Sequence, residues 1–404
     1  MAVDKGDLWF IGPSDMLKGR VEPTIWARMA SSFSEEGWKV RLITPFAYRP
    51  GRVHRDEQGR LVGEEPKGIP IKEVRRYFSL SNAVRLVVLP TPRAPGSSLG
   101  WYRLTVGTVF SIYAGWVLLG RALSKHGRSR QLVIYGRGYI SYLPFLLVGQ
   151  LLRRWLTLSY VFETNAVLFR ERDRDMLRRA DLVVVHSELL KSDLVGLGIP
   201  SERIHVAYLA STIWFDKDAE RSDSTESNMD VETLPKPCAV YTGKGTAGAY
   251  NILEEVARLL NDVAVHVIVV GSNPRATTLN NLHFLGFVPP SLVGSYQAAA
   301  DVLLNIVDPD RTIARHVTPT KLFDYMQIGR PIVSMPFPAL GEFVDGGGVI
   351  VARNSAEIAD GIRRLLDDQV LALDLGRQAL ALSKRFTWPN RAAGISEALG
   401  SVMP

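Results

Sequence analysis

The chain has 404 residues, with 48 Lys and Arg, 41 Asp and Glu, and a single cysteine, Cys238. This length predicts two or three domains, and 46% hydrophobic with 22% charged residues excludes a disordered or fibrous chain. One cysteine excludes a disulfide framework and any multi-cysteine metal site, and favours a reducing compartment. Asp4, Lys5 and Asp7 precede the first apolar stretch, the wrong order for a secretory signal, so we expect a cytoplasmic protein.

Charge is unevenly divided along the chain. Residues 1–210 hold 31 Lys and Arg against 19 Asp and Glu (+12), whereas residues 211–404 hold 17 against 22 (−5). The basic half predicts an anionic partner, either a membrane surface or a phosphorylated substrate, with an Arg-rich solvated surface as the alternative. No aromatic-and-basic RNA-binding signature and no zinc-finger spacing occur, so no nucleic-acid partner is expected.

The first half alternates short apolar runs with amphipathic ones, which predicts parallel strands linked by helices. A helix is expected over 22–36, ended by Gly37, and residues 45–80 are expected to form an irregular excursion. The predicted strands are 8–12, 39–44, 132–135, 158–162 and 182–185. This rhythm is typical of a doubly wound sheet.

Two uncharged stretches, 104–120 and 138–152, raise the question of a membrane span. As a helix the first would reach about 26 Å, short of the roughly 30 Å hydrocarbon core of a bilayer. We therefore expect buried helices of an α/β domain. A surface that touches the bilayer is the first alternative, and a true span is the least favoured one.

A polar linker is predicted at 214–236, where Asp, Glu and Ser are dense and aromatic residues are absent beyond residue 215. It separates an N-terminal domain (1–213) from a C-terminal domain (237–385), and a final helix (386–404) is expected to pack back on the N-terminal domain. The α/β rhythm restarts with strands at 238–242, 263–270, 283–285, 302–306 and 331–335, and helices at 252–260, 291–299, 320–328 and 356–366. Two such domains would leave a cleft between facing strand ends, where these sheets bind ligands.

The most informative segment is 317–335, VTPTKLFDYMQIGRPIVSM. Thr318 is predicted to cap a helix that begins at Pro319 and ends at Gly329. The N–H groups at the start of such a helix attract phosphate. Asp324, about one and a half turns inside the helix, would accept hydrogen bonds from a vicinal diol such as a ribose. The alternative is an ordinary capped helix with an exposed Asp.

This segment resembles the donor-site signature of retaining glycosyltransferases of the GT-B fold, in particular glycosyltransferase family 4. The family's P-x-K-x-x-E-Y run followed by Gly-x-Pro corresponds here to Pro319, Lys321, Asp324, Tyr325, Gly329 and Pro331. Further stretches similar to the family, in the same order, are 22–44, 177–197, 281–305 and Trp388. The resemblance implies two Rossmann-like doubly wound domains facing each other across a cleft. It also implies transfer of a hexosyl-type sugar from a nucleotide-sugar donor, with retention, without a metal and without a cofactor.

By the resemblance, the C-terminal domain binds the donor. Gly243 and Lys244 follow the first strand of that domain, where the family places a Gly-Arg pair on the phosphates, so Lys244 would stabilise the departing diphosphate. The family's second cation is absent, and Arg315 or Lys321 would supply the missing charge.

The family's E-x7-E acids fall on His316 and Asp324, and a His in place of the first acid offers donors where the Glu offers acceptors. The implied donor-binding residues are Gly19, Gly243, Lys244, His316, Thr318, Pro319, Thr320, Lys321 and Asp324.

The implied acceptor side lies in the N-terminal domain. Residues 161–165 (VFETN) align with the strand end where relatives carry a catalytic His, which maps to Glu163 or Asn165. Glu163 would take the proton of the acceptor hydroxyl, and the alternative is a buried, hydrogen-bonded structural Glu. The implied acceptor-binding residues are Gly12, Arg20, Arg137 and Gly138.

The expected acceptor is a lipid-linked or cell-envelope glycan or a small molecule, reached by a cytoplasmic enzyme with peripheral contact at the inner face of the membrane. Two alternatives stay open: a nucleotide-sugar 2-epimerase of the same fold, and a non-catalytic nucleotide-sugar-binding partner subunit. A dinucleotide oxidoreductase is disfavoured, because no strand is followed by G-x-G-x-x-G with an acidic residue about 20 positions on.

Overall fold

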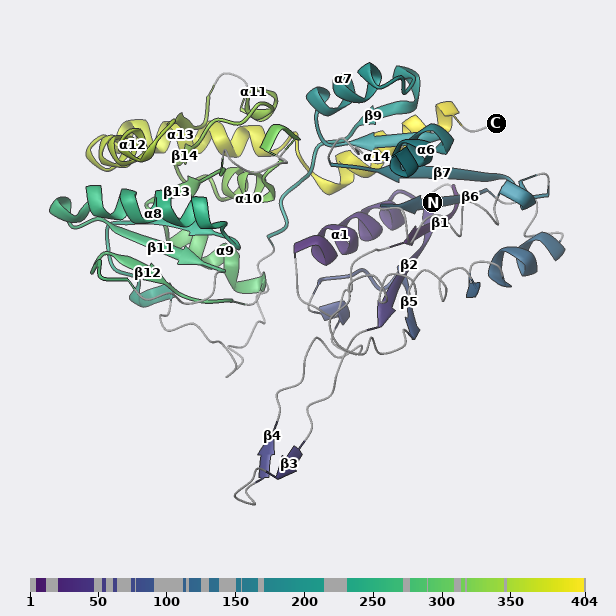
Figure 1. Cartoon of the computed structure of the whole chain (residues 1–404), viewed down its shortest axis with the longest axis horizontal. Coiled ribbons are helices and arrows are strands. Elements are labelled where there is room, and N and C mark those ends of the chain that lie inside the picture. Colours follow the sequence, from purple (N-terminus) through teal and green to yellow (C-terminus); the bar gives the residue numbers. More distant parts are fainter. Residues whose placement is uncertain are drawn as a thin grey trace. The chain divides into compact units, whose positions relative to one another are not determined.

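The computed structural model describes residues 5–11, 21–46, 53–55, 61–63, 74–76, 78–90, 112–113, 116–124, 131–137, 150–153, 155–165, 171–213, 231–271, 277–288, 290–308, 314–316, 318–344 and 347–402. The chain divides into two compact units. The N-terminal unit consists of residues 1–185, 191–207 and 388–404, and the C-terminal unit of residues 186–190 and 208–387. Figure 1 labels their helices and strands.

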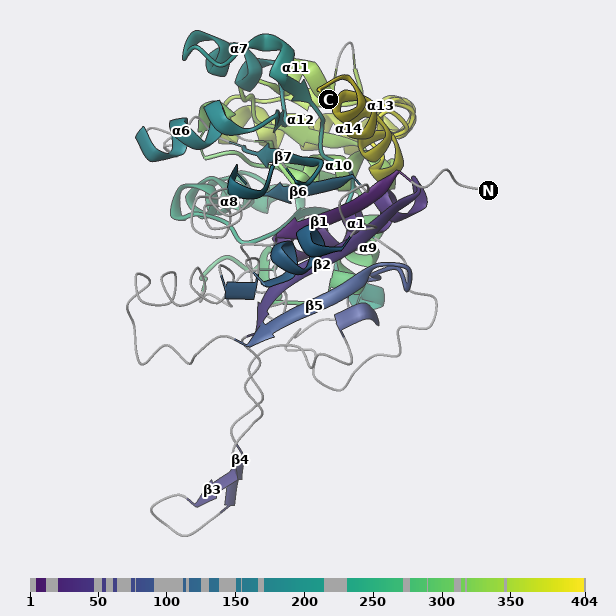
Figure 2. The same ribbon diagram turned by 90° about the vertical axis from the view of Figure 1, so that its right-hand side faces the viewer.

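Within the described residues, the N-terminal unit contains a seven-stranded parallel sheet with the strand order β5-β2-β1-β6-β7-β8-β9. Figure 2 shows β5, β2, β1, β6 and β7 side by side in this order. The strands are β1 Gly6–Ile11, β2 Trp38–Phe46, β5 Arg85–Pro90, β6 Leu132–Gly136, β7 Leu158–Glu163, β8 Leu182–Val185 and β9 Ile204–Val206. The expected irregular excursion contains a short antiparallel hairpin, β3 Val53–Arg55 and β4 Leu61–Gly63.

The described helices of this unit include α1 Val21–Glu35, α6 Glu171–Arg179, most of α7 Glu188–Gly196, and α14 Trp388–Val402. Helix α14 packs on α1 and reaches β8. The indole N–H of Trp38 donates to the Ser396 hydroxyl of α14 at 3.0 Å. Trp26 and Phe33 of α1 form a buried cluster with Phe10 of β1 and Tyr135 of β6, with ring centroids 4.8–6.2 Å apart.

The described part of the C-terminal unit contains a six-stranded parallel sheet with the order β12-β11-β10-β13-β14-β15. Its strands are β10 Cys238–Thr242, β11 His266–Val270, β12 Leu282–Phe284, β13 Val302–Asn305, β14 Ile332–Ser334 and β15 Ile350–Val351. Its described helices include α8 Ala247–Leu259, α9 Pro290–Ala299, α10 Thr320–Ile328, α11 Leu340–Phe343, α12 Ser355–Asp367 and α13 Gln369–Ser383.

Both sheets have the doubly wound strand order in which the first strand lies at the point of reversal. In the N-terminal unit the reversal lies between β1 and β6, and in the C-terminal unit it lies between β10 and β13. The predicted fold class, two Rossmann-like parallel α/β domains, is therefore confirmed. Such sheets bind ligands outside the carboxyl ends of the strands at the reversal.

The connection between the units differs from the predicted one. Residues 208–213 belong to the C-terminal unit, although the sequence assigned them to the N-terminal domain. Their anchors explain this: Tyr208 packs edge-to-face on Phe343 and Phe386, 5.5 and 5.6 Å between centroids, and Ser211 donates to Asp324. The predicted linker falls largely in 214–230, which lies outside the described residues.

The two uncharged stretches are described at 112–113, 116–120 and 150–152, and these parts are not the buried helices that the sequence led us to expect. Trp116 is 74% exposed and Leu151 73% exposed, although Leu118 is fully buried. Among the described helices, none is both long and apolar enough to cross a membrane.

Candidate functional site

The carboxyl edge of the C-terminal sheet is closed by glycines. Gly243, Gly271 and Gly286 follow β10, β11 and β12, with φ of +113°, +92° and +81°. The Gly243 N–H donates to the Val270 carbonyl, and the Gly271 N–H to the Gly286 carbonyl, each at 2.7 Å. A Cβ on Gly271 would come within 3.3 Å of the Gly243 backbone. Because glycine has no side chain, a ligand can approach the backbone closely at Gly243 and Gly271, which are partly exposed, whereas Gly286 is buried.

Lys321 brings the first turn of α10 to this edge. A Cβ on Gly243 would lie 3.7 Å from the Lys321 amine, and that amine sits 3.6 Å from the ring centroid of Tyr241 in β10. Lys244 is exposed in the loop that follows Gly243. The predicted residues Gly243, Lys244 and Lys321 thus meet at the end of β10, where the start of helix α10 adds its partial positive charge.

The start of α8 is a second feature of this edge, and sequence reasoning missed it. The run Gly243-Lys244-Gly245-Thr246-Ala247-Gly248 has the G-x-G-x-x-G spacing between strand and helix, although no acidic residue follows at the end of β11 within its described residues. Thr246 caps the helix by accepting from the Ala249 N–H at 3.2 Å. The spacing was readable from the sequence, and it places three glycines where a backbone must be approached closely.

Asp308, three residues beyond β13, covers the start of α8. It accepts a hydrogen bond from the Thr246 hydroxyl, and a Cβ on Gly248 would come within 2.6 Å of its carboxylate. A carboxylate at a helix N-terminus is stabilised by the helix dipole. The positive end of the α8 dipole is therefore compensated by the Asp308 carboxylate, whereas the start of α10 carries a cation, Lys321.

Asp324 departs from its expected role. It is buried, and its Oδ1 accepts from the Ser211 hydroxyl at 2.9 Å and the Thr212 N–H at 2.6 Å, while the Thr212 hydroxyl lies 3.2–3.3 Å from both carboxylate oxygens. Burial raises the pKa of this carboxyl, and the hydrogen bonds from Thr212 and Ser211 oppose that rise. The carboxylate thus fastens the segment 208–213 to α10, and its Oδ1 is occupied where a ribose was expected.

The neighbouring Tyr325 fixes α10 to the end of β10. Its hydroxyl accepts from the Thr242 N–H at 2.9 Å, and Gln297 of α9 donates to the Thr242 hydroxyl at 3.0 Å. All three side chains are buried, and burial raises the pKa of Tyr325. This network holds Lys321, four residues earlier on α10, in register with Gly243.

The start of α10 differs in detail from the prediction. Pro319 is the N-cap, Thr320 is the first helical residue, and no side chain caps the helix. Thr318 does not cap the helix, because the proline at the N-cap moves the helix start one residue later. The Thr318 hydroxyl is buried and has no hydrogen-bond partner among the described residues. Gly329 ends the helix in the left-handed conformation, as expected (φ +73°).

The two remaining donor-side predictions lie in a short 3-10 turn, Ala314–His316. Arg315 is exposed, whereas His316 is 8% exposed. Of these two side chains, that of Arg315 is the more exposed to solvent.

In the N-terminal unit, Glu163 takes the structural alternative rather than the catalytic one. It is 2% exposed at the end of β7 and lies 3.1 Å from the guanidinium of Arg391 on α14. Tyr135 donates its hydroxyl to the same carboxylate oxygen, and Arg391 also donates to the Ala207 carbonyl. Burial and the neighbouring Glu163 raise the pKa of Tyr135. A carboxylate held in this way is not placed to take a proton from an acceptor.

Arg137 and Asn165 stand at the carboxyl edge of the N-terminal sheet, just after β6 and β7. Asn165 is exposed and Arg137 half-buried. The other predicted residues of this edge, Gly12, Gly19, Arg20 and Gly138, lie outside the described residues.

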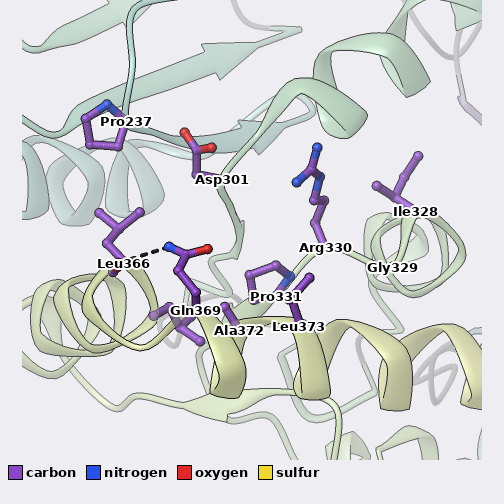
Figure 3. A pocket seen from close by; sticks show the side chains of 11 residues that line it. Pro237, Asp301, Ile328, Gly329, Arg330, Pro331, Leu366, Gln369, Ala372 and Leu373 are labelled. Atoms are coloured by element: carbon purple, nitrogen blue, oxygen red, sulfur yellow. Dashed lines mark hydrogen bonds between the residues drawn. The ribbon is translucent and has the colours of Figure 1, made fainter.

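A cavity of about 400 Å³ lies at the opposite, amino edge of the C-terminal sheet (Figure 3). Asp301 and Pro331, which precede β13 and β14, line it together with Arg330 and Leu373. Arg330 donates to the Ala298 carbonyl at 3.0 Å. None of the predicted site residues lines this cavity. Among the described residues, no group of three or more His, Cys, Asp or Glu could hold a metal ion.

A chain with two Rossmann-like parallel α/β domains matches the fold of the GT-B glycosyltransferases. The fold is similar to that of Anabaena HepE in complex with UDP and glucose (TM-score 0.62, 14% identity, 98% of this chain and 99% of that chain). It is similar to a UDP-forming α,α-trehalose-phosphate synthase from Burkholderia vietnamiensis (0.62, 11%, 98% and 99%). It also resembles a putative UDP-N-acetylglucosamine 2-epimerase from Listeria monocytogenes (0.55, 10%, 99% and 96%).

The sequence of the C-terminal unit carries a more specific match. Residues 237–368, from the residue before β10 to the end of α12, match the family "Glycosyl transferases group 1". This stretch, which is similar to that family, contains the glycines at the sheet edge and Lys321. No curated protein matches the chain.

Proposed function

We propose that the protein is a glycosyltransferase that takes a sugar from a nucleoside-diphosphate donor, with the diphosphate bound at the carboxyl edge of the C-terminal sheet. The observation that carries the proposal is the meeting of Lys321 with the Gly243 backbone inside a stretch similar to the glycosyl transferases group 1 family. A diphosphate needs cations and N–H donors. Lys321 and Lys244 are the proposed cations, and the first N–H groups of α10 are the proposed donors, because those of Gly243 and Gly271 are already bonded to carbonyls. HepE and the trehalose-phosphate synthase, both named with UDP, support UDP as the first nucleotide to test.

The finer features of the proposed reaction are retention at the anomeric carbon, transfer of a hexosyl group and independence of a metal. Charge builds on the departing diphosphate, and the proposed stabilisers are Lys244, Lys321 and the N-terminus of α10. Arg315 is the third candidate cation. The proposed acceptor is a lipid-linked or cell-envelope glycan, bound by the N-terminal unit through Arg137 and Asn165.

Nucleotide binding is tested by the thermal shift that UDP produces, compared with GDP, TDP, ADP and CMP. A nucleotide at 100 times its Kd stabilises a protein by about 2.7 kcal/mol. Lys321→Ala and Lys244→Ala should each weaken UDP binding by about 10- to 100-fold, which corresponds to one charge-assisted hydrogen bond. Lys384→Ala, an exposed lysine at the C-cap of α13, is the matched control and should leave the shift unchanged. A wild-type protein that no nucleotide stabilises would refute the proposal.

Turnover separates the proposed activity from its two alternatives. With a UDP-sugar and an acceptor, release of UDP with transfer of the sugar supports the glycosyltransferase, and each lysine variant should lower the rate by about 10²- to 10³-fold. Isomerisation of the UDP-sugar without an acceptor would indicate the epimerase. Nucleotide binding without either reaction would indicate a non-catalytic subunit. Chelation with EDTA should leave the rate unchanged if the proposed reaction needs no metal.

A further inference from the structure

Large apolar side chains are exposed together in the part of the N-terminal unit that precedes β6 and β7. Trp116, Leu119 and Leu123 are 74%, 47% and 77% exposed, and Leu151 and Trp155 are 73% and 46% exposed. Single exposed apolar residues are normal, whereas a contiguous group of this size marks an interaction surface.

The first three residues share one face of a helix. They lie in the helical residues 116–123 at spacings of three and four, which align side chains along one side. The opposite side holds the helix to the unit: Leu118 is fully buried, and Arg121 pairs with Asp7 of β1. This helix is therefore docked by one face and presents the other, apolar face to solvent.

The second pair of residues lies at the same edge of the sheet as the first. Arg121 reaches the Gln131 carbonyl just before β6, and the Leu132 N–H donates to the Thr157 carbonyl at 2.9 Å, two residues after Trp155. Strands β6 and β7 are paired in parallel. The helical residues 116–123 and the segment 150–155 thus approach the same amino edge of the sheet, one strand apart.

All the charged side chains in the surrounding sequence are basic. No Asp or Glu occurs in residues 74–162, between Glu73 and Glu163, whereas that segment contains twelve Lys and Arg. A segment without acids and with many cations is attracted to an anionic surface, by about 1 kcal/mol for each Lys or Arg that comes near it.

We propose that Trp116, Leu119, Leu123, Leu151 and Trp155 form a docking surface that inserts into the headgroup region of an anionic lipid bilayer. Exposed Trp and Leu beside cations are the side chains that partition into that region. The inference deepens the proposed function, because docking on a bilayer would bring the enzyme to a lipid-linked acceptor. Only this link to the acceptor rests on the proposed function.

A second copy of the chain fits this surface less well. A two-fold symmetric contact would place the same patch against itself, and with it two acid-free basic segments whose charges repel. An anionic bilayer instead offers complementary charge and an apolar layer to the same residues.

The experiment is co-sedimentation with vesicles of 30% phosphatidylglycerol in phosphatidylcholine, compared with vesicles of phosphatidylcholine alone. Wild-type protein should bind the anionic vesicles at least tenfold more tightly, and less at high salt. The double variant Trp116→Ser/Leu123→Ser should lose at least tenfold of that binding. The matched control Val370→Ser/Leu373→Ser removes two apolar side chains that are 79% and 59% exposed on α13 of the C-terminal unit, and it should bind as wild type does.

Absence of binding to the anionic vesicles, or equal loss in the control, would overturn the inference. So would sedimentation showing a wild-type dimer that Trp116→Ser/Leu123→Ser dissociates, with no effect on vesicle binding. The UDP thermal shift is recorded on the same variants and should stay at the wild-type value. Loss of vesicle binding with a retained UDP shift bears on the docking surface alone, and a wild-type protein that binds vesicles but no nucleotide bears on the proposed function alone.

Discussion

The two sheets share one topology, yet different kinds of residue follow the strands at their carboxyl edges. In the C-terminal unit, glycines follow β10 to β12, and the Lys321 amine lies 3.7 Å from where a Cβ on Gly243 would stand. In the N-terminal unit, β7 ends in Glu163, which is buried against Arg391 and Tyr135. An edge of bare backbone and cations is suited to a phosphate, whereas a buried ion pair is suited to holding a helix.

The comparison teaches that a charged residue at the carboxyl edge of a sheet has no fixed role. Glu163 and Lys321 both lie at the carboxyl edge of a Rossmann-like sheet, where ligands bind. What separates them is the surroundings: a guanidinium and a phenol enclose Glu163, and a glycine and an aromatic face lie beside Lys321. The predictions below test this difference, from the largest expected effect to the smallest.

Arg391→Met should destabilise the protein most, by about 3–5 kcal/mol, because it leaves Glu163 buried without its cation. Urea unfolding measures the loss. The double variant Glu163→Gln/Arg391→Met should recover part of it, since a neutral amide can still accept from Tyr135. Arg353→Met is the control, because Arg353 is 75% exposed where it pairs with Glu357, and it should cost at most about 1 kcal/mol. An unchanged unfolding midpoint in Arg391→Met would contradict the structural role.

Asp324→Ala should destabilise the protein by about 1–3 kcal/mol, because the buried Thr212 N–H and Ser211 hydroxyl lose their acceptor. Asp324→Asn keeps an acceptor oxygen and should cost less. UDP affinity, measured by calorimetry, should change by less than about threefold in Asp324→Asn. The reverse outcome, a stable Asp324→Asn variant with tenfold weaker UDP binding, would indicate that Asp324 binds the ribose as the sequence predicted.

Gly243→Ala and Gly198→Ala place the same strain at two different positions. Both glycines have positive φ, +113° and +84°, so each alanine should cost about 1–2 kcal/mol of stability. Only Gly243→Ala should also weaken UDP binding, because its Cβ would stand beside the Lys321 amine, whereas nothing lies within 4 Å of a Cβ at Gly198. Equal UDP affinity in the two variants would show that the glycine edge is not the binding surface.

Acid should weaken the N-terminal unit through His205, and this effect is the smallest. Burial, and then the positive charge of Arg391, lower the pKa of His205 from its ordinary 6.5. Below pH 6.5 the unfolded chain therefore binds the proton more readily than the folded one, and stability falls as the pH falls. His205→Gln should reduce the drop in Tm between pH 7.5 and pH 5.5. His283→Gln is the comparison in the C-terminal unit, where burial also lowers the imidazole pKa. An unchanged drop in His205→Gln would exclude this cause.

Prolines and glycines at the ends of helices and strands explain which parts of the fold could be predicted from the sequence. Strand β10 has the predicted bounds, 238–242, and helix α10 ends at the predicted residue 328, because a proline or glycine stands beside each of these ends. Helix α8 begins five residues before the prediction, at Ala247, because two glycines precede its cap Thr246 and weaken the helical pattern.

The candidate site was predicted only in part, because the rest depends on distant residues. Glu163 is enclosed by Arg391, and Asp324 is occupied by Ser211 and Thr212, and neither pairing leaves a local signal. Asp308 could have been found, since it follows the buried strand beside the sheet reversal. The exposure of Trp116 could not, because an uncharged helix reads the same whether its outer face meets protein or solvent.

The chain leaves the N-terminal unit at residues 207–208 and returns to it at 387–388. Helix α14, which carries Arg391, is therefore synthesised after every residue of the C-terminal unit. On the ribosome the order of completion is inverted relative to the usual one, in which the first domain made is the first to fold. The C-terminal unit can therefore close before residues 388–402, and with them the cation that pairs with Glu163, have been synthesised.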